Sequence, residues 1–156
     1  MAIKLNQKAP EIKLQNQNDQ TEKLSDYKGQ WVLIYFYPKD DTSGCTTEAC
    51  AIRDSFPKFG KLKAKILGIS IDSVASHKKF ADKYKLPFSL LADIDKKVVE
   101  KYGVWTEKSM YGRKYMGILR SSFLVDPEGK IVRIYEKVKP AEHADQVLAD
   151  LKELQK

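Results

Sequence analysis

The sequence has no apolar run of membrane-spanning length, and its 156 residues include only two cysteines and two histidines. A membrane helix needs about 20 consecutive apolar residues, so a protein anchored by such a helix is excluded. Two cysteines are too few for a secreted disulfide scaffold, and residues 1–10 lack the apolar core of a signal peptide. We therefore expect a cytoplasmic protein, in which a disulfide is more often catalytic or sensing than structural.

Arginine is scarce as well: only four of the 28 basic residues are arginines, and the lysines are spread over the whole chain. The formal net charge of +7 raises the question of a nucleic acid or an anionic membrane as partner. Nucleic-acid readers usually gather arginine and lysine on one face. We interpret the charge as a solvated lysine-rich surface and expect neither nucleic acid nor membrane as partner. A basic nucleic-acid-binding protein with buried cysteines is the alternative from a different class.

The hydrophobic pattern predicts strands and helices along most of the chain. Strands are predicted at residues 9–14, 31–37, 65–71, 86–91, 118–125 and 130–137. Helices are predicted at 24–29 as a single turn, from Thr42 to about residue 59 with a kink or end at Pro57, and at 74–84, 95–102 and 140–154. Residues 15–22 are predicted as a polar loop. Residues 104–117, which have no clear period, are predicted as a long loop that lines or covers a site.

The continuous apolar character of residues 31–37 indicates a strand that is covered on both faces. Together with the order of elements, it predicts an α/β fold in which a central mixed β-sheet is flanked by helices on both faces. A length of 156 residues suits one domain that buries roughly two-thirds of its unfolded surface. No linker or internal repeat divides the chain, so we expect a single domain over residues 1–156.

Both cysteines lie in one stretch, residues 38–50, which reads PKDDTSGCTTEAC. If a helix begins near Ser43, Cys45 sits in its first turn, where unpaired N–H groups and the helix dipole favour an anion. Because cysteine reacts as the thiolate, this position meets one condition for a reactive thiol. On a regular helix the Cα atoms of Cys45 and Cys50 are roughly 8.7 Å apart. A disulfide needs about 4.4–6.8 Å, so pairing them requires the helix to unwind.

The residues alone leave the role of the two cysteines open. Each is also compatible with a small buried hydrophobic residue, which is a common role for cysteine. A metal site is disfavoured, because His77 and His143 are distant in sequence and fall on predicted helices. We expect both histidines to be surface or helix-capping residues. The absence of a C-x-x-C motif argues against an ordinary thioredoxin-type disulfide exchanger.

Pro38, Thr42 and Cys45 match the motif P-x-x-x-T-x-x-C, and Cys50 follows five residues later. In this pattern the chain resembles the peroxiredoxins, and within them the Q-type subfamily, also called bacterioferritin comigratory protein. The run RSSF at residues 120–123 is similar to the strand that carries the family's active-site arginine. The resemblance extends over nearly the whole chain and implies a thioredoxin-like fold. Ser43 departs from the family, which often has proline there; we expect this to alter loop stiffness and leave the chemistry intact.

The resemblance implies a thiol-dependent peroxidase that reduces hydrogen peroxide and organic hydroperoxides. Cys45 resembles the peroxidatic cysteine, which attacks the peroxide and becomes a sulfenic acid. Thr42 resembles the residue whose hydroxyl contacts thiolate and peroxide, and Pro38 resembles the residue that shields the thiolate from water. Arg120 resembles the cation that keeps the thiolate charged, and Glu48 is expected to orient Arg120.

Cys50 resembles the resolving cysteine, which would form an intramolecular disulfide with Cys45 that thioredoxin or a similar dithiol reduces. No metal, haem or flavin cofactor is implied, because sulfur carries both electrons. Members of the subfamily are often monomers and sometimes dimers. The alternative within enzymes is a thiol–disulfide oxidoreductase or redox sensor that uses the same disulfide.

Overall fold

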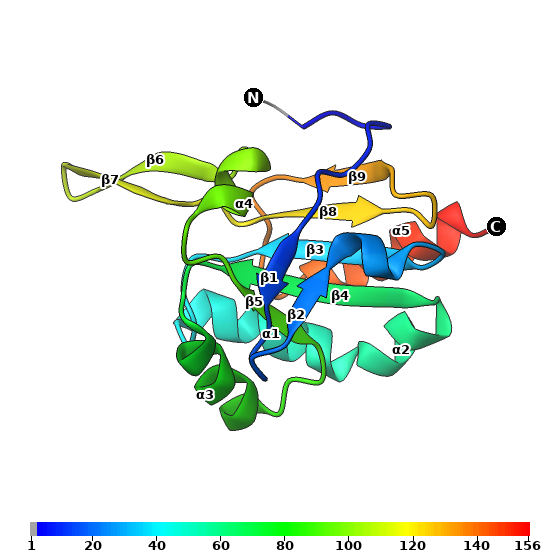
Figure 1. The fold of residues 1–156 in the computed structure, drawn as a ribbon, viewed down its shortest axis with the longest axis horizontal. Coiled ribbons are helices and arrows are strands. Elements are labelled where there is room, and N and C mark those ends of the chain that lie inside the picture. Colours follow the sequence, from blue (N-terminus) through cyan, green and yellow to red (C-terminus); the bar gives the residue numbers. More distant parts are fainter. Residues whose placement is uncertain (1–2) are drawn as a thin grey trace.

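The computed structural model describes residues 3–156, and Figure 1 shows their arrangement. Within this range a seven-stranded sheet has the order β2-β1-β5-β4-β3-β8-β9. Its strands are β1 (Lys13–Gln15), β2 (Thr21–Lys23), β3 (Trp31–Phe36), β4 (Ala64–Ser70), β5 (Ser89–Ala92), β8 (Ser121–Val125) and β9 (Ile131–Tyr135). Strands β6 (Trp105–Met110) and β7 (Arg113–Ile118) form a separate hairpin. The helices are the 3₁₀ turn η1 (Leu24–Tyr27), α1 (Ser43–Asp54), α2 (Phe56–Lys61), α3 (Val74–Tyr84), α4 (Lys97–Lys101) and α5 (His143–Leu154).

Strand β3 lies inside a sheet with both parallel and antiparallel neighbours. It runs parallel to β4 and antiparallel to β8. Strand β4 is also parallel to β5, whereas β1 pairs antiparallel with β5. Parallel neighbours need crossover connections, which α1 with α2 provides between β3 and β4, and α3 between β4 and β5. The predicted α/β class with a central mixed sheet is confirmed.

The side chains of β3 alternate between two hydrophobic clusters, one on each face of the sheet. Leu33 packs in the cluster that contains Ala49 of α1, and Ile34 packs in the cluster that contains Val99 of α4. All four side chains are fully buried. Burying one large aliphatic side chain contributes roughly 1.5–3 kcal/mol, so cover on both faces stabilises this strand strongly. The predicted two-sided cover of residues 31–37 is therefore confirmed.

The prediction of a long loop at residues 104–117 is wrong, because most of this segment forms the β6–β7 hairpin (Figure 1). Tyr111 and Gly112 have positive φ values of 51° and 77°, the conformation of a tight two-residue hairpin turn. The hairpin projects from the body of the molecule and exposes Met110, Tyr115 and Met116. These exposed apolar side chains obscure the alternation that would otherwise mark two strands.

The end of α1 agrees with the prediction, whereas the first two strands lie at other residues than predicted. The kink or end expected at Pro57 in the helix from Thr42 to residue 59 is confirmed, since α1 ends at Asp54 and α2 starts at Phe56, one residue before the proline. Pro57 lies in the first turn of α2, where its missing N–H leaves no helical hydrogen bond unmade. The strand predicted at 9–14 is displaced to β1, and β2 lies partly inside the predicted loop 15–22.

The helix predicted at residues 74–84 is confirmed as α3, where the hydroxyl of Ser73 accepts a hydrogen bond from the Ser76 amide at 3.1 Å. This bond satisfies one of the free amides at the start of the helix. Among residues 3–156, no helix combines the length and the apolar character needed to cross a membrane.

Candidate active site

The turn from β3 into α1 positions Cys45. Strand β3 ends at Phe36, Thr42 is the N-cap of α1, and Cys45 is the third residue of the helix. The Cys45 side chain is buried, with 1% of its surface exposed. The first amides of a helix have no partner within it and form the positive end of its dipole. The sulfur of Cys45 is therefore placed where backbone electrostatics favour a negative charge.

Arg120 supplies a cation beside this sulfur. Its Nη2 donates a hydrogen bond to the Cys45 Sγ at 3.2 Å. Arg120 lies just before β8, which begins at Ser121, so the expectation of a strand that includes the arginine is wrong by one residue. At Gly44 an added Cβ would come within 3.0 Å of Nη2, so the missing side chain there leaves room for the guanidinium.

Glu48 holds the other side of the same guanidinium. Its Oε1 accepts a hydrogen bond from Arg120 Nη1 at 2.9 Å, while its Oε2 has no hydrogen-bond partner in the described structure. Burial raises the pKa of Glu48 to about 7, although the charge of Arg120 acts in the opposite direction. Burial also disfavours the charge on Arg120, yet the interactions with Cys45 and Glu48 outweigh it and raise the pKa of the arginine. One guanidinium thus bridges the sulfur and a buried carboxyl group.

Tyr35 borders this cluster and was missed in the sequence. Its ring lies against Gly68 of β4, where an added Cβ would approach the ring to 2.8 Å. The hydroxyl is buried and has no hydrogen-bond partner among residues 3–156, and its pKa is raised by burial first and then by the charges of Glu48 and Cys45. The alternation in β3 was the available signal, because it places Tyr35 on the same face of the sheet as Leu33, in the cluster that also contains Cys45.

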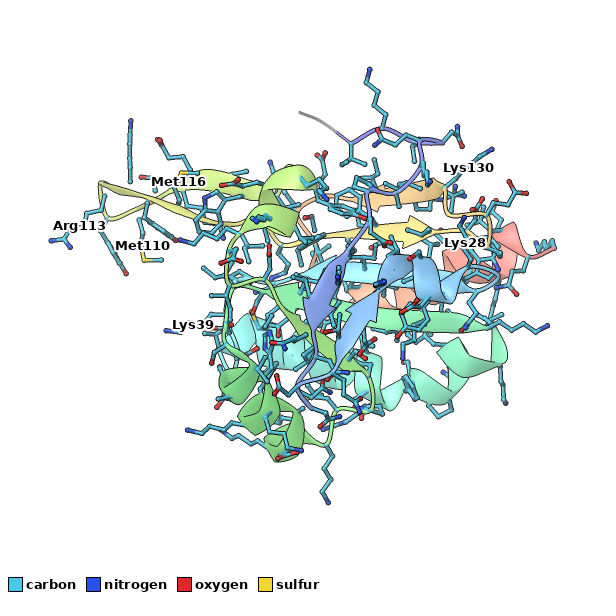
Figure 2. All side chains as sticks on the ribbon, in the orientation of Figure 1. Lys28, Lys39, Met110, Arg113, Met116 and Lys130 are labelled. Atoms are coloured by element: carbon cyan, nitrogen blue, oxygen red, sulfur yellow. The ribbon has the colours of Figure 1, made fainter. Side chains whose placement is uncertain are left out.

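The β6–β7 hairpin also reaches the site through Lys108, which the loop prediction did not identify. Burial and then the charge of Arg120 lower the pKa of Lys108, while Cys45 acts to raise it. The aliphatic stem of Lys108 crosses Gly117, where an added Cβ would lie 3.1 Å from the lysine Cδ. Figure 2 shows Lys39, from the loop before α1, on the same side of the view as Met110 of the hairpin. Lys108 is therefore the hairpin residue whose pKa is affected by the charges of Arg120 and Cys45.

The other residues singled out in the sequence lie around α1 but differ in their contacts. Pro38 is half-buried directly after β3, and Thr42 is exposed. The Thr42 hydroxyl donates to the Lys39 carbonyl at 2.8 Å and makes no cap bond to a helix amide. Cys45 and Cys50 are both free thiols in the same helix. The structure therefore brings Cys45, Arg120 and Glu48 into contact, whereas Cys50 is on α1 without a bond to Cys45.

The expectation that both histidines are surface or capping residues is wrong. His77 of α3 and His143 of α5 are buried, with 0% and 1% of their surfaces exposed. Each has a polar partner inside: Asp40 lies 2.7 Å from His77 Nδ1, and the Ser122 hydroxyl lies 2.7 Å from His143 Nε2. Burial lowers the pKa of His143 to about 4. Polar partners on neighbouring elements, which a helical pattern does not show, explain the difference.

An α/β fold that presents a buried thiol at a helix start, in contact with a partly buried guanidinium, is typical of thiol-dependent redox enzymes. The chain belongs to the AhpC/TSA family, whose model matches residues 5–134. It is 48% identical to peroxiredoxin Bcp of Bacillus subtilis over 154 residues, which are 99% of this chain and 98% of that protein. It is 46% identical to the same-named protein of Escherichia coli over 145 residues, 93% of each chain.

Solved structures agree with this assignment. Peroxiredoxin Q of Xanthomonas campestris is 46% identical, with a TM-score of 0.88 over 93% of this chain and 92% of that chain. A mutant PrxQ of Xylella fastidiosa is 35% identical, with a TM-score of 0.95 over 100% of this chain and 99% of that chain. The resemblance to Q-type peroxiredoxins and the thioredoxin-like fold are therefore confirmed, and the chain is a thiol-dependent peroxidase of this group.

The Glu48 carboxyl group predicts a pH dependence of stability. Because its pKa rises from 4.5 to about 7 on folding, the folded state holds a proton that the unfolded state has lost. This contribution is fully present below pH 4.5 and is lost as the pH rises through 7. At about 1.4 kcal/mol per unit of pKa, it amounts to about 3 kcal/mol.

Replacing Glu48 by glutamine should remove this contribution. We expect the free energy of unfolding of the wild type minus that of Glu48→Gln to fall by up to about 3 kcal/mol as the pH rises over that interval. Denaturant unfolding at several pH values measures it, and the exposed Glu107→Gln is the control. A difference that does not change with pH would contradict the assignment.

Proposed function

We propose that this chain reduces hydrogen peroxide and organic hydroperoxides, with Cys45 as the peroxidatic residue. The observation that carries the proposal is the 3.2 Å contact between Arg120 Nη2 and Cys45 Sγ. A guanidinium stays charged at any physiological pH and donates directional hydrogen bonds, so it favours a thiolate over a thiol. The Xanthomonas campestris bacterioferritin comigratory protein, 45% identical, is described with alkyl peroxide reduction activity.

In the first step the Cys45 sulfur would attack the terminal oxygen of the hydroperoxide. The sulfur–oxygen bond forms as the O–O bond breaks, and the alkoxide that leaves takes up a proton to become an alcohol. The sulfur gives up two electrons and becomes a sulfenic acid. Arg120 would stabilise the charge that develops on the leaving oxygen, because a preorganised cation needs no reorganisation during reaction.

The neighbouring residues are assigned supporting roles. The Thr42 hydroxyl already donates to the Lys39 carbonyl, so its oxygen keeps lone pairs with which to accept the O–H of the peroxide. Pro38 would shield the thiolate from water at the end of β3. Glu48 would orient Arg120 through their 2.9 Å hydrogen bond. These roles are supported by the contacts around Cys45 and by the match of the motif.

In the second step the Cys50 thiol would attack the sulfenic sulfur and release water, which leaves a Cys45–Cys50 disulfide. Both cysteines lie on α1, and a regular helix holds residues five apart at roughly 8.7 Å between Cα atoms. The first turns of α1 must therefore unwind in each cycle. A dithiol such as thioredoxin would then reduce this disulfide to two thiols and would itself be oxidised to a disulfide.

The proposal extends to the domain structure, the oligomeric state and the location of the protein. A single domain over residues 1–156 is supported by the two hydrophobic clusters, which pack on opposite faces of one sheet. A monomer is favoured over a dimer by analogy with the subfamily. A cytoplasmic location suits an enzyme whose two cysteines must return to free thiols in each cycle.

A coupled assay tests the function. The protein is mixed with thioredoxin, thioredoxin reductase and NADPH, and NADPH oxidation is followed after addition of hydrogen peroxide or an alkyl hydroperoxide. We expect steady turnover that needs both peroxide and thioredoxin. A redox sensor with the same disulfide would oxidise slowly and show no sustained turnover. Consumption of peroxide no faster than by an equal concentration of free cysteine would refute the peroxidase assignment.

A further inference from the structure

A buried polar network lies beside the loop that precedes Cys45. Asp40 is at its centre, with 8% of its surface exposed. Its Oδ1 accepts a hydrogen bond from the Tyr37 hydroxyl at 2.6 Å. Its Oδ2 lies 2.7 Å from His77 Nδ1 and accepts a hydrogen bond from the Ser76 hydroxyl at 2.8 Å. A buried carboxylate with three such partners holds its own backbone in place.

The backbone of the loop and the histidine are fixed by further bonds. The Asp40 amide donates to Asp72 Oδ2 at 2.8 Å, and the same oxygen accepts from the Ser70 hydroxyl at 2.7 Å. His77 Nε2 lies 3.0 Å from the Leu91 carbonyl, which can only accept, so Nε2 donates. The other ring nitrogen, Nδ1, faces Asp40 Oδ2 at 2.7 Å. The network thus ties the loop to the ends of β3, β4 and β5 and to α3.

Asp41 gives the loop a second attachment to α3. Its carboxylate accepts hydrogen bonds from Lys83 Nζ and from the Tyr84 hydroxyl, each at 2.8 Å. Its φ of 56° is in the left-handed region, which costs energy for a residue other than glycine. Among residues 3–156, the side-chain bonds of Asp40 and Asp41 run to β3, α3 and the segments that flank them, and none runs to α1. The side chains of Asp40 and Asp41 therefore hold the loop without using the helix that follows it.

We propose that Asp40 and His77 are positioning residues that hold the loop 38–42 in place while α1 unwinds after Thr42. This inference rests on the two-cysteine cycle proposed above. Asp40 does not need to touch the peroxide. Its effect is that Pro38 and Thr42 keep their positions when Cys45 leaves for Cys50, so that the thiolate returns to a site that is already assembled.

A bound cation is a competing explanation for the cluster of Asp40, Asp72 and His77, whose ligand-type atoms lie within 4.8 Å of one another. However, both Asp40 oxygens, Asp72 Oδ2 and both ring nitrogens already have partners in the network. Hydrogen bonding among these groups therefore accounts for their arrangement.

Two substitutions, Asp40→Ala and Asp40→Asn, distinguish the positioning effect of the Asp40 hydrogen bonds from an effect of its charge. Alanine removes all the side-chain bonds of Asp40. Asparagine keeps an oxygen for the Tyr37 hydroxyl and offers an N–H to the Nδ1 of a neutral His77. We expect stopped-flow oxidation of Cys45 by hydrogen peroxide to slow about 10- to 100-fold in Asp40→Ala, since small misplacements of reacting groups cost this much. Asp40→Asn should stay within about threefold of the wild type, and the later disulfide step should not slow in either variant.

Asp93→Ala is the matched control, because Asp93 is also a buried aspartate, with 1% of its surface exposed, and accepts a hydrogen bond from the amide of Val99 in α4. It should lower stability and leave Cys45 oxidation unchanged. The proposal is overturned if Asp40→Ala reacts at the wild-type rate, if Asp40→Asn is as slow as Asp40→Ala, or if Asp93→Ala slows oxidation equally.

Hydrogen exchange distinguishes a failure of this inference from a failure of the proposed function. In Asp40→Ala the amide of residue 40, which in the wild type donates to Asp72 Oδ2, should lose protection, whereas in the oxidised wild type this amide should stay protected and protection should be lost only after Thr42. If the wild type itself is not oxidised rapidly, the peroxidase proposal fails. The exchange result still decides whether Asp40 holds the loop 38–42 in place. Unchanged protection of the residue 40 amide in Asp40→Ala would overturn this inference.

Discussion

Peroxide consumption by Cys45→Ser is expected to fall at least about 10³-fold, to the level of the buffer, as removal of a catalytic nucleophile does in other enzymes. A serine hydroxyl is far less acidic than a thiol and remains neutral beside Arg120, so the 3.2 Å contact no longer holds an anion. Oxygen also cannot take the place of sulfur as the two-electron donor. The substitution is nearly isosteric and Cys45 is buried, so the fold should persist.

The coupled assay with thioredoxin measures this loss, and circular dichroism verifies the fold. Thr47→Ser is a matched control on the exposed face of the same helix, since serine keeps the bond of the Thr47 hydroxyl to the Ser43 carbonyl. It should turn over like the wild type. Normal peroxide consumption by Cys45→Ser would mean that another group reacts with peroxide, and the assignment of Cys45 would fail.

The sheet and most helices could be predicted because their residues carry local signals. The run at 31–37 can be stable only when covered on both faces, and Leu33 and Ile34 are buried on opposite sides of β3 as this requires. The β6–β7 hairpin could not be recognised in the same way. Its strands lie outside the main sheet and expose Met110 and Tyr115, so burial imposes no alternation on them. The turn at Tyr111–Gly112 was the one signal, and it is short.

The candidate site, like the fold, could be predicted only in part from the sequence. Cys45, Glu48 and Arg120 were predicted from a motif, and the structure brings them into contact. The link between Asp40 and His77 joins residues 37 positions apart and depends on how β4 and α3 pack, which no local pattern encodes. Buried polar pairs of this kind are visible only once the fold has placed their partners. That is also why both histidines were wrongly expected at the surface.

The two cysteines place opposite demands on α1. The helix must be intact to present Cys45 to Arg120, and it must unwind to bring Cys45 to Cys50. Oxidation itself favours the change, because a neutral sulfenic acid is attracted to Arg120 less than a thiolate is. Ala49 and Ile52 remain packed in the core cluster, so they favour unwinding of the first turns over loss of the whole helix. On the N-terminal side of α1, the loop 38–42 that Asp40 and Asp41 hold would limit how far the unwinding extends.

Cys50→Ser should therefore separate the two halves of the cycle. We expect one equivalent of peroxide per chain to be consumed at nearly the wild-type rate, after which thioredoxin-supported turnover stops. The first step needs Cys45 and Arg120, whose contact does not involve Cys50. The second step needs a thiol that can reach the sulfenic acid, and within the described residues Cys50 is the other free thiol.

A stopped-flow burst followed by trapping of the sulfenic acid with a dimedone-type reagent measures this outcome. The wild type should be trapped poorly, because its own Cys50 consumes the sulfenic acid first, whereas Cys50→Ser should be labelled stoichiometrically at Cys45. Sustained cycling of Cys50→Ser with thioredoxin would mean that the reductant resolves the sulfenic acid directly. In that case α1 would have no reason to unwind, and the distance between the two cysteines along the helix would carry no functional meaning.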